Sequence, residues 1–339
     1  MLKNLAKYPI YIICILLGHA VYVVIKKTPK FAHLSMIRLF CLTGGKSNDL
    51  INSVIRKIKK VYKFEQIDGI CGIESESEKA RAIYNLKAHG FYVFEKKLPK
   101  DLCDNLLKFA VSHESTMRSM DCQTDYDEKK VIYPRGKPLA VRYDFSTKDL
   151  LGNNDVQRVL ADISFAAFSQ SYLESKPVID ILSMWWHTDF SDKPDSQAAQ
   201  YYHFDLDRPK WLKFFIYLTD VESTNGPHTY VAGSHKSQGI PAQLLDKGYA
   251  RLSDEEVERH YDAKDLMEFV APRGTIIVED TRGLHKGKHV ENGDRLILQV
   301  QYSNSLFGAL YPKVHMGDNL CADLRDSIGK YPDLYKAYL

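Results

Sequence analysis

The sequence predicts a mainly β protein with flanking helices, and three observations support this fold class. Segments rich in aromatic and β-branched residues, which suit a pleated sheet, recur through the second half of the chain. Segments with helical apolar spacing come before and between them. The 339 residues leave room for a single β-domain, which often fills about 200–250 residues. The hydrophobic share of 45% and the charged share of 26% are typical of a globular protein with a full core.

Six short segments are the predicted strands. They are rich in apolar, aromatic and β-branched residues, and the Asn225-Gly226 pair after the fourth of them is a turn signal. These strands cover residues 90–94, 140–145, 181–190, 211–219, 274–279 and 295–302.

Four segments are predicted as helices, at residues 51–62, 75–86, 98–109 and 156–172. The third begins with Leu98-Pro99, and proline is tolerated in the first turn of a helix. The first carries four basic residues opposite its apolar positions. It is either a solvated helix face, which we favour, or a helix on an anionic membrane surface. Residues 117–130 predict a polar loop, and residues 243–266 a charged, partly helical insertion.

Residues 8–25 are mostly apolar and carry no formal charge. As a helix they would measure roughly 27 Å, close to the ~30 Å hydrocarbon thickness of a bilayer. The lysines that flank the segment are Lys3, Lys7, Lys26, Lys27 and Lys30. The heavier positive flank on the C-terminal side would keep the rest of the chain in the cytoplasm. The alternative is a buried helix of a soluble fold.

The predicted organisation has four parts. Residues 1–30 hold the candidate membrane anchor, residues 31–75 a basic helical linker, residues 76–310 the β-domain and residues 311–339 a C-terminal tail. The net charge of +3, with no long basic patch beyond the N-terminal region, argues against a nucleic acid partner. Six scattered cysteines without a CxxC pair indicate reduced thiols in the cytosol, rather than disulfides or a zinc site.

The chemistry of the sequence centres on His203 and Asp205. Side chains two residues apart in an extended strand point the same way, so this imidazole and this carboxylate can reach one cation. A second imidazole, from His285, would complete a set of two histidines and one carboxylate, which holds Fe(II) and leaves other coordination positions open. Arg295 starts a predicted strand ten residues after His285. Its planar guanidinium suits a carboxylate partner.

The ordered set of motifs resembles the phytanoyl-CoA dioxygenase family from about residue 88 to residue 305. The motifs are His203-x-Asp205, Asn225-Gly226, Val231-Ala-Gly-Ser-His235, His285-x-Gly287 and Arg295. The family usually has proline where this chain has Ala232, in a turn. The resemblance implies a double-stranded β-helix, a jelly-roll core of the cupin kind. It also favours His285 over His289, because only His285 is followed by the glycine and the arginine at the family's spacing.

The resemblance further implies an oxidoreductase with Fe(II), 2-oxoglutarate and O2 as cofactors. His203, Asp205 and His285 would bind the metal, and Arg295 would pair with the far carboxylate of 2-oxoglutarate. The reaction would be that of a dioxygenase, which hydroxylates its substrate and releases succinate and CO2. Halogenating relatives replace the carboxylate with a small residue, so an intact Asp205 favours hydroxylation.

The substrate is expected to be a small molecule or, if residues 8–25 are an anchor, a lipid-linked molecule. The candidate substrate contacts are large or charged residues that precede the segment with His203 and Asp205: Arg142, Tyr143, Trp185 and Trp186. We expect at least one of the two tryptophans to pack in the core instead. Two alternatives stay open. One is a non-catalytic, membrane-tethered binding protein on the same fold, and the other is a cupin-like metal enzyme that does not use 2-oxoglutarate.

Overall fold

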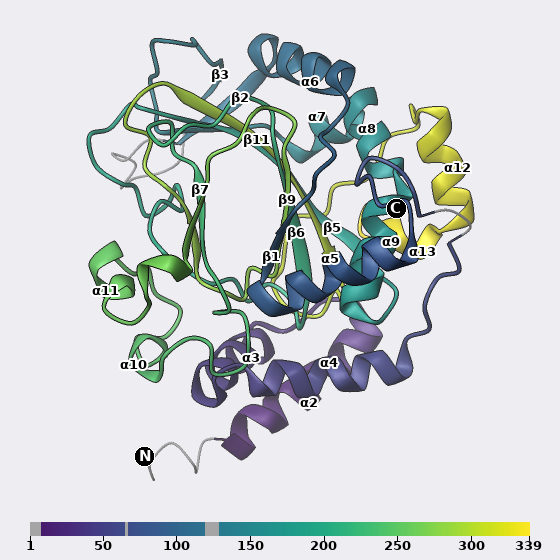
Figure 1. Ribbon diagram of the computed structural model, residues 1–339. Coiled ribbons are helices and arrows are strands. Elements are labelled where there is room, and N and C mark those ends of the chain that lie inside the picture. The colour runs from purple at the N-terminus through teal and green to yellow at the C-terminus, as the bar shows by residue number, and fades with distance from the viewer. Residues whose placement is uncertain (1–7, 65–66, 119–128) are drawn as a thin grey trace.

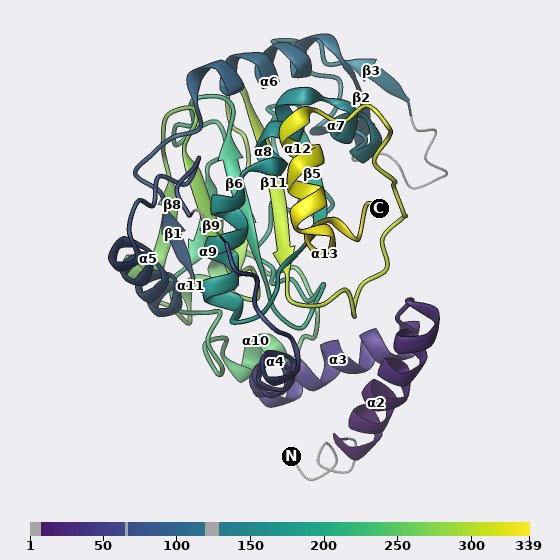
Figure 2. The same ribbon diagram turned by 90° about the vertical axis from the view of Figure 1, so that its right-hand side faces the viewer.

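The computed structural model describes residues 8–64, 67–118 and 129–339. Lys3, Lys7 and most of the predicted loop at residues 117–130 lie outside these ranges. The described chain forms a β-fold with helices over one face of its larger sheet and a layer of three helices at one end (Figure 1; Figure 2).

The larger sheet has eight antiparallel strands among the described residues. Its strands, in spatial order, are β1 (Phe91–Val93), β9 (Ile276–Glu279), β6 (Trp211–Tyr217), β11 (Asp294–Ser303), β5 (Val178–Thr188), β4 (Arg142–Asp144), β2 (Glu114–Arg118) and β3 (Lys130–Ile132). All six predicted strands are found in this sheet. The longest pairing joins β11 to β5, with Arg295 opposite His187.

The smaller sheet consists of β10 (His285–Gly287), β7 (His228–Val231) and β8 (Leu266–Phe269), in that spatial order. An isolated bridge between His203 and His285 adds the segment that carries His203 and Asp205 to the edge of this sheet. From β5 onward, with this segment counted in the smaller sheet, the chain passes back and forth between the two sheets, except that the consecutive strands β7 and β8 both lie in the smaller one. The two sheets enclose a cavity lined from both sides. This is a double-stranded β-helix, and the predicted fold class is confirmed.

Helices on the outer face of the larger sheet cover its apolar side (Figure 2). They are α5 (Glu76–His89), α6 (Lys100–Ser112), α7 (Thr147–Gly152), α8 (Asn154–Ala161), α9 (Ile163–Leu173), α12 (Ala322–Lys330) and α13 (Pro332–Tyr335). The single helix predicted for residues 156–172 is wrong, because the chain breaks at Asp162. Its backbone is extended, and its carboxylate accepts the Ser164 N–H that begins α9. The C-terminal segment contributes Leu324 and Tyr335 to this core.

Because side chains alternate along β5, one face of this strand packs under the helices and the other faces the space between the two sheets. Trp186 packs into the core under the helices, together with Tyr143. Trp185 faces the space between the sheets, where it packs with Phe215 and Ile297. The cavity between the sheets is therefore lined by the face of β5 that carries Trp185.

The insertion between β7 and β8 is partly helical, as predicted. It holds α10 (Ala242–Leu245), α11 (Asp254–Glu258) and a 3-10 turn, η1 (Ala263–Asp265). Ser253 and Glu256 form a reciprocal capping box at the start of α11, which satisfies free backbone N–H groups there.

Three N-terminal helices form the layer at the end of the β-fold (Figure 1). They are α2 (Tyr8–Ile25), α3 (Lys30–Thr43) and α4 (Lys46–Ile58). The helix predicted at residues 51–62 thus begins earlier and ends earlier, and α3 was not predicted. By length and composition α2 is able to cross a membrane. Most of its apolar side chains are exposed.

Candidate metal centre

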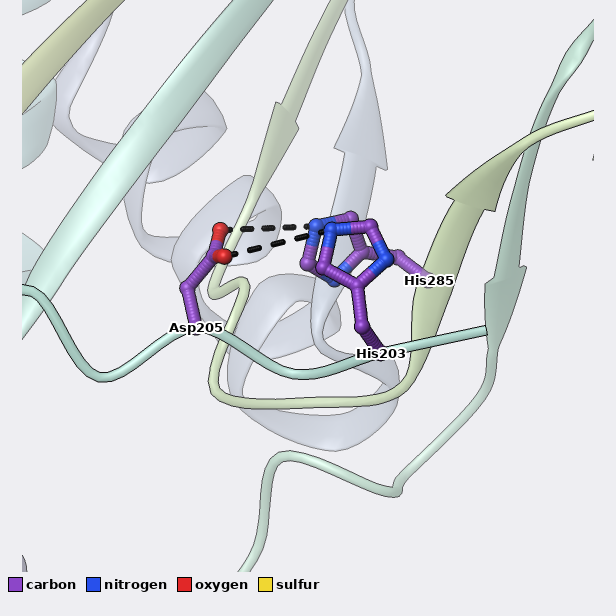
Figure 3. A group of neighbouring side chains, drawn as sticks. All are labelled: His203, Asp205 and His285. Atoms are coloured by element: carbon purple, nitrogen blue, oxygen red, sulfur yellow. Dashed lines mark ion pairs between the residues drawn. The ribbon is translucent and has the colours of Figure 1, made fainter. Parts of the chain in front are cut away.

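Three buried side chains from two separate segments converge in the cavity between the sheets. The ligand atoms of His203, Asp205 and His285 all lie within 4.8 Å of one another. Nε2 of His203 is 3.9 Å from Oδ1 of Asp205, and Nε2 of His285 is 3.4 Å from Oδ2. Figure 3 shows both imidazoles turned toward the carboxylate. The set of two histidines and one carboxylate predicted from the sequence is therefore brought together in space.

The backbone fixes this convergence. The N–H of His203 donates to the carbonyl of His285 at 3.0 Å, and the N–H of His285 donates back to the carbonyl of His203 at 2.9 Å. The N–H of Asp205 donates to the carbonyl of Thr281 at 2.8 Å. These bonds place the two imidazole centroids 4.3 Å apart.

Each histidine also has its tautomer set by a local carbonyl. Nδ1 of His203 lies 2.9 Å from the carbonyl oxygen of Tyr201, and Nδ1 of His285 lies 3.0 Å from that of Gly283. A carbonyl oxygen only accepts, so each Nδ1 carries the proton and each Nε2 offers its lone pair. Two imidazole nitrogens and one carboxylate oxygen form the donor set that non-haem iron takes in this arrangement.

Lys213 is a charged partner of the cluster that the sequence reasoning missed. Its Nζ donates to Oδ2 of Asp205 at 2.5 Å and lies 3.4 Å from Oδ2 of Asp207. Burial alone would raise the pKa of the Asp205 carboxyl, but Lys213 and His285 hold it well below its usual range. Burial lowers the pKa of His203 well below 6.5, and neighbouring His285 lowers it further. A carboxylate and a neutral imidazole are the forms that bind metal.

Arg295 lies on the wall of the same cavity, which has a volume of about 290 Å³. It is only 1% exposed, and burial lowers its pKa to about 10, so it remains charged at neutral pH. Its Nη2 donates to Nδ1 of His187 at 2.7 Å. Its Nε and Nη1 have no partner among the described residues. Two buried, unpaired donors of a cation beside a metal-type donor set fit a carboxylate ligand such as 2-oxoglutarate.

Gly287 makes room for this guanidinium. A Cβ at that position would lie 2.8 Å from Nη2 of Arg295, which is too close for an unmoved side chain. The glycine two residues after His285 therefore has a steric reason in this structure.

The four predicted substrate contacts divide between two faces. Arg142 and Trp185 line the cavity, with the guanidinium carbon 4.5 Å from the indole centroid. Tyr143 and Trp186 lie in the core under the helices, away from the cavity. Neighbouring residues of a strand point to opposite faces, so each pair contributes one side chain to each interior.

The other histidines lie outside the ligand cluster. His228 lines the cavity, but its Nε2 is paired with Oε2 of Glu279 at 2.9 Å. His235 is buried near Gly90, and His289 is half-buried on the loop after β10. His187 also lines the cavity, where it serves as the partner of Arg295.

Comparison with known proteins places this site in a family context. The model of the family described as Phytanoyl-CoA dioxygenase (PhyH) matches residues 86–295. No curated protein sequence matches significantly.

Several solved structures are similar in fold. The non-heme alpha ketoglutarate dependent epimerase SnoN from nogalamycin biosynthesis has a TM-score of 0.47 at 14% identity, over 68% of this chain and 84% of that chain. HygX from Streptomyces hygroscopicus, with nickel and 2-oxoglutarate bound, has a TM-score of 0.47 at 17% identity, over 72% and 93%. EctD from S. alaskensis, with bound Fe, has a TM-score of 0.48 at 16% identity, over 75% and 86%.

Proposed function

Because the chain belongs to the phytanoyl-CoA dioxygenase family, we propose that it is an Fe(II)- and 2-oxoglutarate-dependent dioxygenase. It hydroxylates a small-molecule or lipid-linked substrate and releases succinate and CO2. One observation carries this proposal: the cluster of His203, Asp205 and His285 shares a cavity with a buried guanidinium that has two unpaired donors.

The residues take separate roles in this proposal. Nε2 of His203, Nε2 of His285 and one oxygen of Asp205 bind Fe(II), which supplies the redox chemistry with O2 and 2-oxoglutarate. Lys213 keeps Asp205 ionised and holds one of its oxygens. The carbonyls of Tyr201 and Gly283 hold the imidazoles in the tautomer that binds metal. Arg295 fixes the far carboxylate of 2-oxoglutarate, which orients the keto acid toward the metal.

The cavity wall indicates a polar substrate, because Lys213 and Arg142 are already paired with carboxylates and Arg295 is assigned to 2-oxoglutarate, which leaves Arg251. Its cations are Arg142, Lys213, Arg251 and Arg295, and its carboxylates are Asp205 and Asp207. Arg251 is exposed, so it is available to a substrate that enters from solvent. The guanidinium of Arg142 lies over the ring of Trp185, so an apolar group and a charge lie side by side in the cavity wall. We assign substrate contact to Arg142 and Trp185, and a packing role to Tyr143 and Trp186.

Attachment to the cytoplasmic face of a membrane through α2 is part of this proposal. It is supported by the length and apolar composition of the helix, by its exposure, and by Lys26 and Lys27 directly after it. Attachment would bring the cavity close to lipid-linked substrates.

The test is a succinate-release assay with Fe(II), 2-oxoglutarate and O2, screened against lipids, glycans and amino acids. Asp205→Ala removes the carboxylate ligand and is expected to abolish succinate release with every substrate. Asp318→Ala, at an exposed carboxylate, is the matched control and keeps wild-type rates. Undiminished succinate release by Asp205→Ala would contradict the assignment of the metal centre.

A further inference from the structure

One side of α2 is held against the protein along the whole length of the helix. The residues on this side recur every three or four positions: Tyr8, Tyr11, Cys14, Ile15, Gly18 and Tyr22. The Tyr8 hydroxyl donates to the carbonyl of Leu42 at 2.9 Å, near the start of the helix. Tyr22 packs edge-on against Phe307 near its end, with centroids 5.6 Å apart. Halfway between them, a Cβ at Gly18 would collide with Ala32.

The helix against which α2 packs is itself fixed to the β-fold. In α3, His33 is hydrogen-bonded to the carbonyl of Leu206 at 2.9 Å, and Phe40 stacks on Phe204. The first turn of α4 is fastened by Asn48, whose amide donates to the carbonyl of Pro209 at 3.1 Å. A movement of α2 away from the domain would break this continuous contact.

The other side of α2 is apolar and exposed. Nine large apolar side chains there are between 38% and 78% exposed: Ile10, Ile12, Ile13, Leu16, Leu17, Val21, Val23, Val24 and Ile25. Exposed apolar surface of this extent marks an interaction site, because water is a poor solvent for it.

Helix α4 exposes a second apolar stripe at the same end of the molecule. Leu50, Val54 and Ile58, four residues apart, are 68%, 50% and 74% exposed. Arg56 and Lys57 lie in the last turn of the helix. A basic helix with an exposed apolar stripe is typical of helices that lie at a membrane surface. Figures 1 and 2 both show α2, α3 and α4 gathered at this end.

This packing favours an orientation of α2 in the plane of the membrane surface. If α2 crossed the bilayer, α3 would have to enter the hydrocarbon beside it, together with the exposed charges of Lys30 and Arg38. The part of the β-fold to which α3 is fixed at Leu206 and Phe204 would have to follow, and burial of charged and polar groups in hydrocarbon is unfavourable. An in-plane α2 buries its apolar side chains and leaves α3 attached to the β-fold.

A cavity of about 630 Å³ lies beside this layer, between α2, α4 and the C-terminal segment. Five lysines line it: Lys26, Lys27, Lys59, Lys313 and Lys336. Within the described ranges, no carboxylate forms an ion pair with any of the five. The one aspartate in the lining, Asp180, is already paired with Arg208. The net charge of the cavity wall therefore suits an anion.

The same cavity has an apolar side. Ile55, Ile58 and Leu310 line it, and the last two are exposed. Tyr311 lines both this cavity and the cavity of the metal centre. A ligand with a charged head and an apolar chain would match both kinds of wall.

We propose that the α2–α4 layer lies flat on an anionic membrane and that the cavity beside it binds one acidic lipid. The lipid headgroup lies among the lysines and its chain along Ile55, Ile58 and Leu310. The role of the lipid rests on the proposed function. Because Tyr311 lines both cavities, a lipid bound here would lie next to the cavity of the metal centre. Lipid binding is measured without turnover, so it can fail while the oxygenase assignment holds, and the reverse.

The first test is co-sedimentation of the full chain with vesicles of phosphatidylcholine alone or with added phosphatidylglycerol. The wild type is expected to bind the anionic vesicles. The double variant Lys313→Glu, Lys336→Glu should lose about tenfold or more in affinity, since each lysine near an anionic surface contributes substantially. The matched control, Lys97→Glu with Lys148→Glu, makes the same charge change at exposed lysines outside the cavity and should keep wild-type binding. Equal loss in both double variants, or no preference of the wild type for anionic vesicles, would overturn the proposal.

The second test measures how deeply three positions of α2 enter the bilayer. Ile13→Trp, Leu17→Trp and Val24→Trp place a fluorophore at three exposed positions on one side of α2. With vesicles of lipids brominated at different depths, an in-plane helix gives the same shallow quenching at all three. Quenching that is deepest at Leu17→Trp, less deep at Ile13→Trp and shallowest at Val24→Trp indicates a crossing helix, since the other two positions lie about 6 and 10 Å from Leu17 along its axis, and refutes the in-plane orientation.

Discussion

Replacement of Arg295 by methionine tests whether this side chain binds the co-substrate. The change keeps most of the side-chain volume and removes the guanidinium. Nε and Nη1 are unpaired and buried, and Nη2 has a second N–H besides the one that it donates to His187. One carboxylate can therefore accept two hydrogen bonds, one from Nη2 and one from the neighbouring unpaired nitrogen. Hydrogen bonds to charged groups contribute about 1.5–3 kcal/mol each. Loss of two such bonds corresponds to about 3–6 kcal/mol, or roughly a 10²–10⁴-fold higher KM for 2-oxoglutarate.

The assay is the initial rate of succinate release as a function of 2-oxoglutarate concentration, at a fixed substrate concentration. Arg295→Lys keeps a charge but loses the planar pair of donors, and an intermediate KM is expected. Arg273→Met is the matched control, because Arg273 pairs with Asp104 at the protein surface. It should leave the KM unchanged.

The same variant has a second readout in the absence of 2-oxoglutarate. A buried guanidinium with two unpaired donors destabilises the fold, so Arg295→Met is expected to keep or raise the melting temperature of the protein without ligand. Added 2-oxoglutarate and metal should then stabilise the wild type more than the variant. An unchanged KM for 2-oxoglutarate in a folded Arg295→Met protein would refute the role of this arginine.

Three further predictions concern neighbouring parts of the molecule. Gly287→Ala places a methyl group against Nη2 of Arg295 and should raise the KM for 2-oxoglutarate, whereas Gly152→Ala, with open space around it, should not. Burial lowers the pKa of His235 to about 4, so between pH ~6.5 and that value the unfolded chain binds a proton that the folded chain does not. Stability therefore falls by about 1.4 kcal/mol per pH unit as the pH falls through this range, and urea unfolding of His235→Gln should show a weaker pH dependence than that of the wild type. Trp186→Ala should cost about 3–5 kcal/mol in urea unfolding, and a loss below 1 kcal/mol would contradict its place in the core.

The sequence was sufficient for the fold class and for the three side chains that meet at the candidate metal centre. The spacing of His203 and Asp205 places them on one face, and an ordered set of motifs supplied the partner histidine. Lys213 was missed, although a lone charge within an otherwise apolar and aromatic strand was a usable signal. The carbonyls of Tyr201 and Gly283 had no signal, because every residue carries the same backbone oxygen.

Other features depend on tertiary contacts that a single sequence does not contain. Alternation shows that Trp185 and Trp186 face opposite ways, but not which of them faces the cavity. The helix breaks at Asp162 because this side chain caps the start of α9. The apolar spacing continues across the break, so the sequence pattern predicts one helix instead of two. By length and composition α2 is able to cross a membrane, whereas the in-plane orientation that we propose rests on its contacts with α3, which the sequence does not show.

The reciprocal backbone pairing of His203 with His285 has a consequence for how such a protein can diversify. The backbone hydrogen bonds between His203 and His285 set the distance between the two imidazoles. Most of the insertion that contains α10 and α11 does not contribute to these bonds. Lengthening or reshaping this insertion can therefore change the cavity wall, to which Arg251 belongs, and leave the positions of the two imidazoles unchanged. A slip of one residue at the pairing itself would turn an imidazole to the opposite face, so tolerance to insertions should change abruptly there.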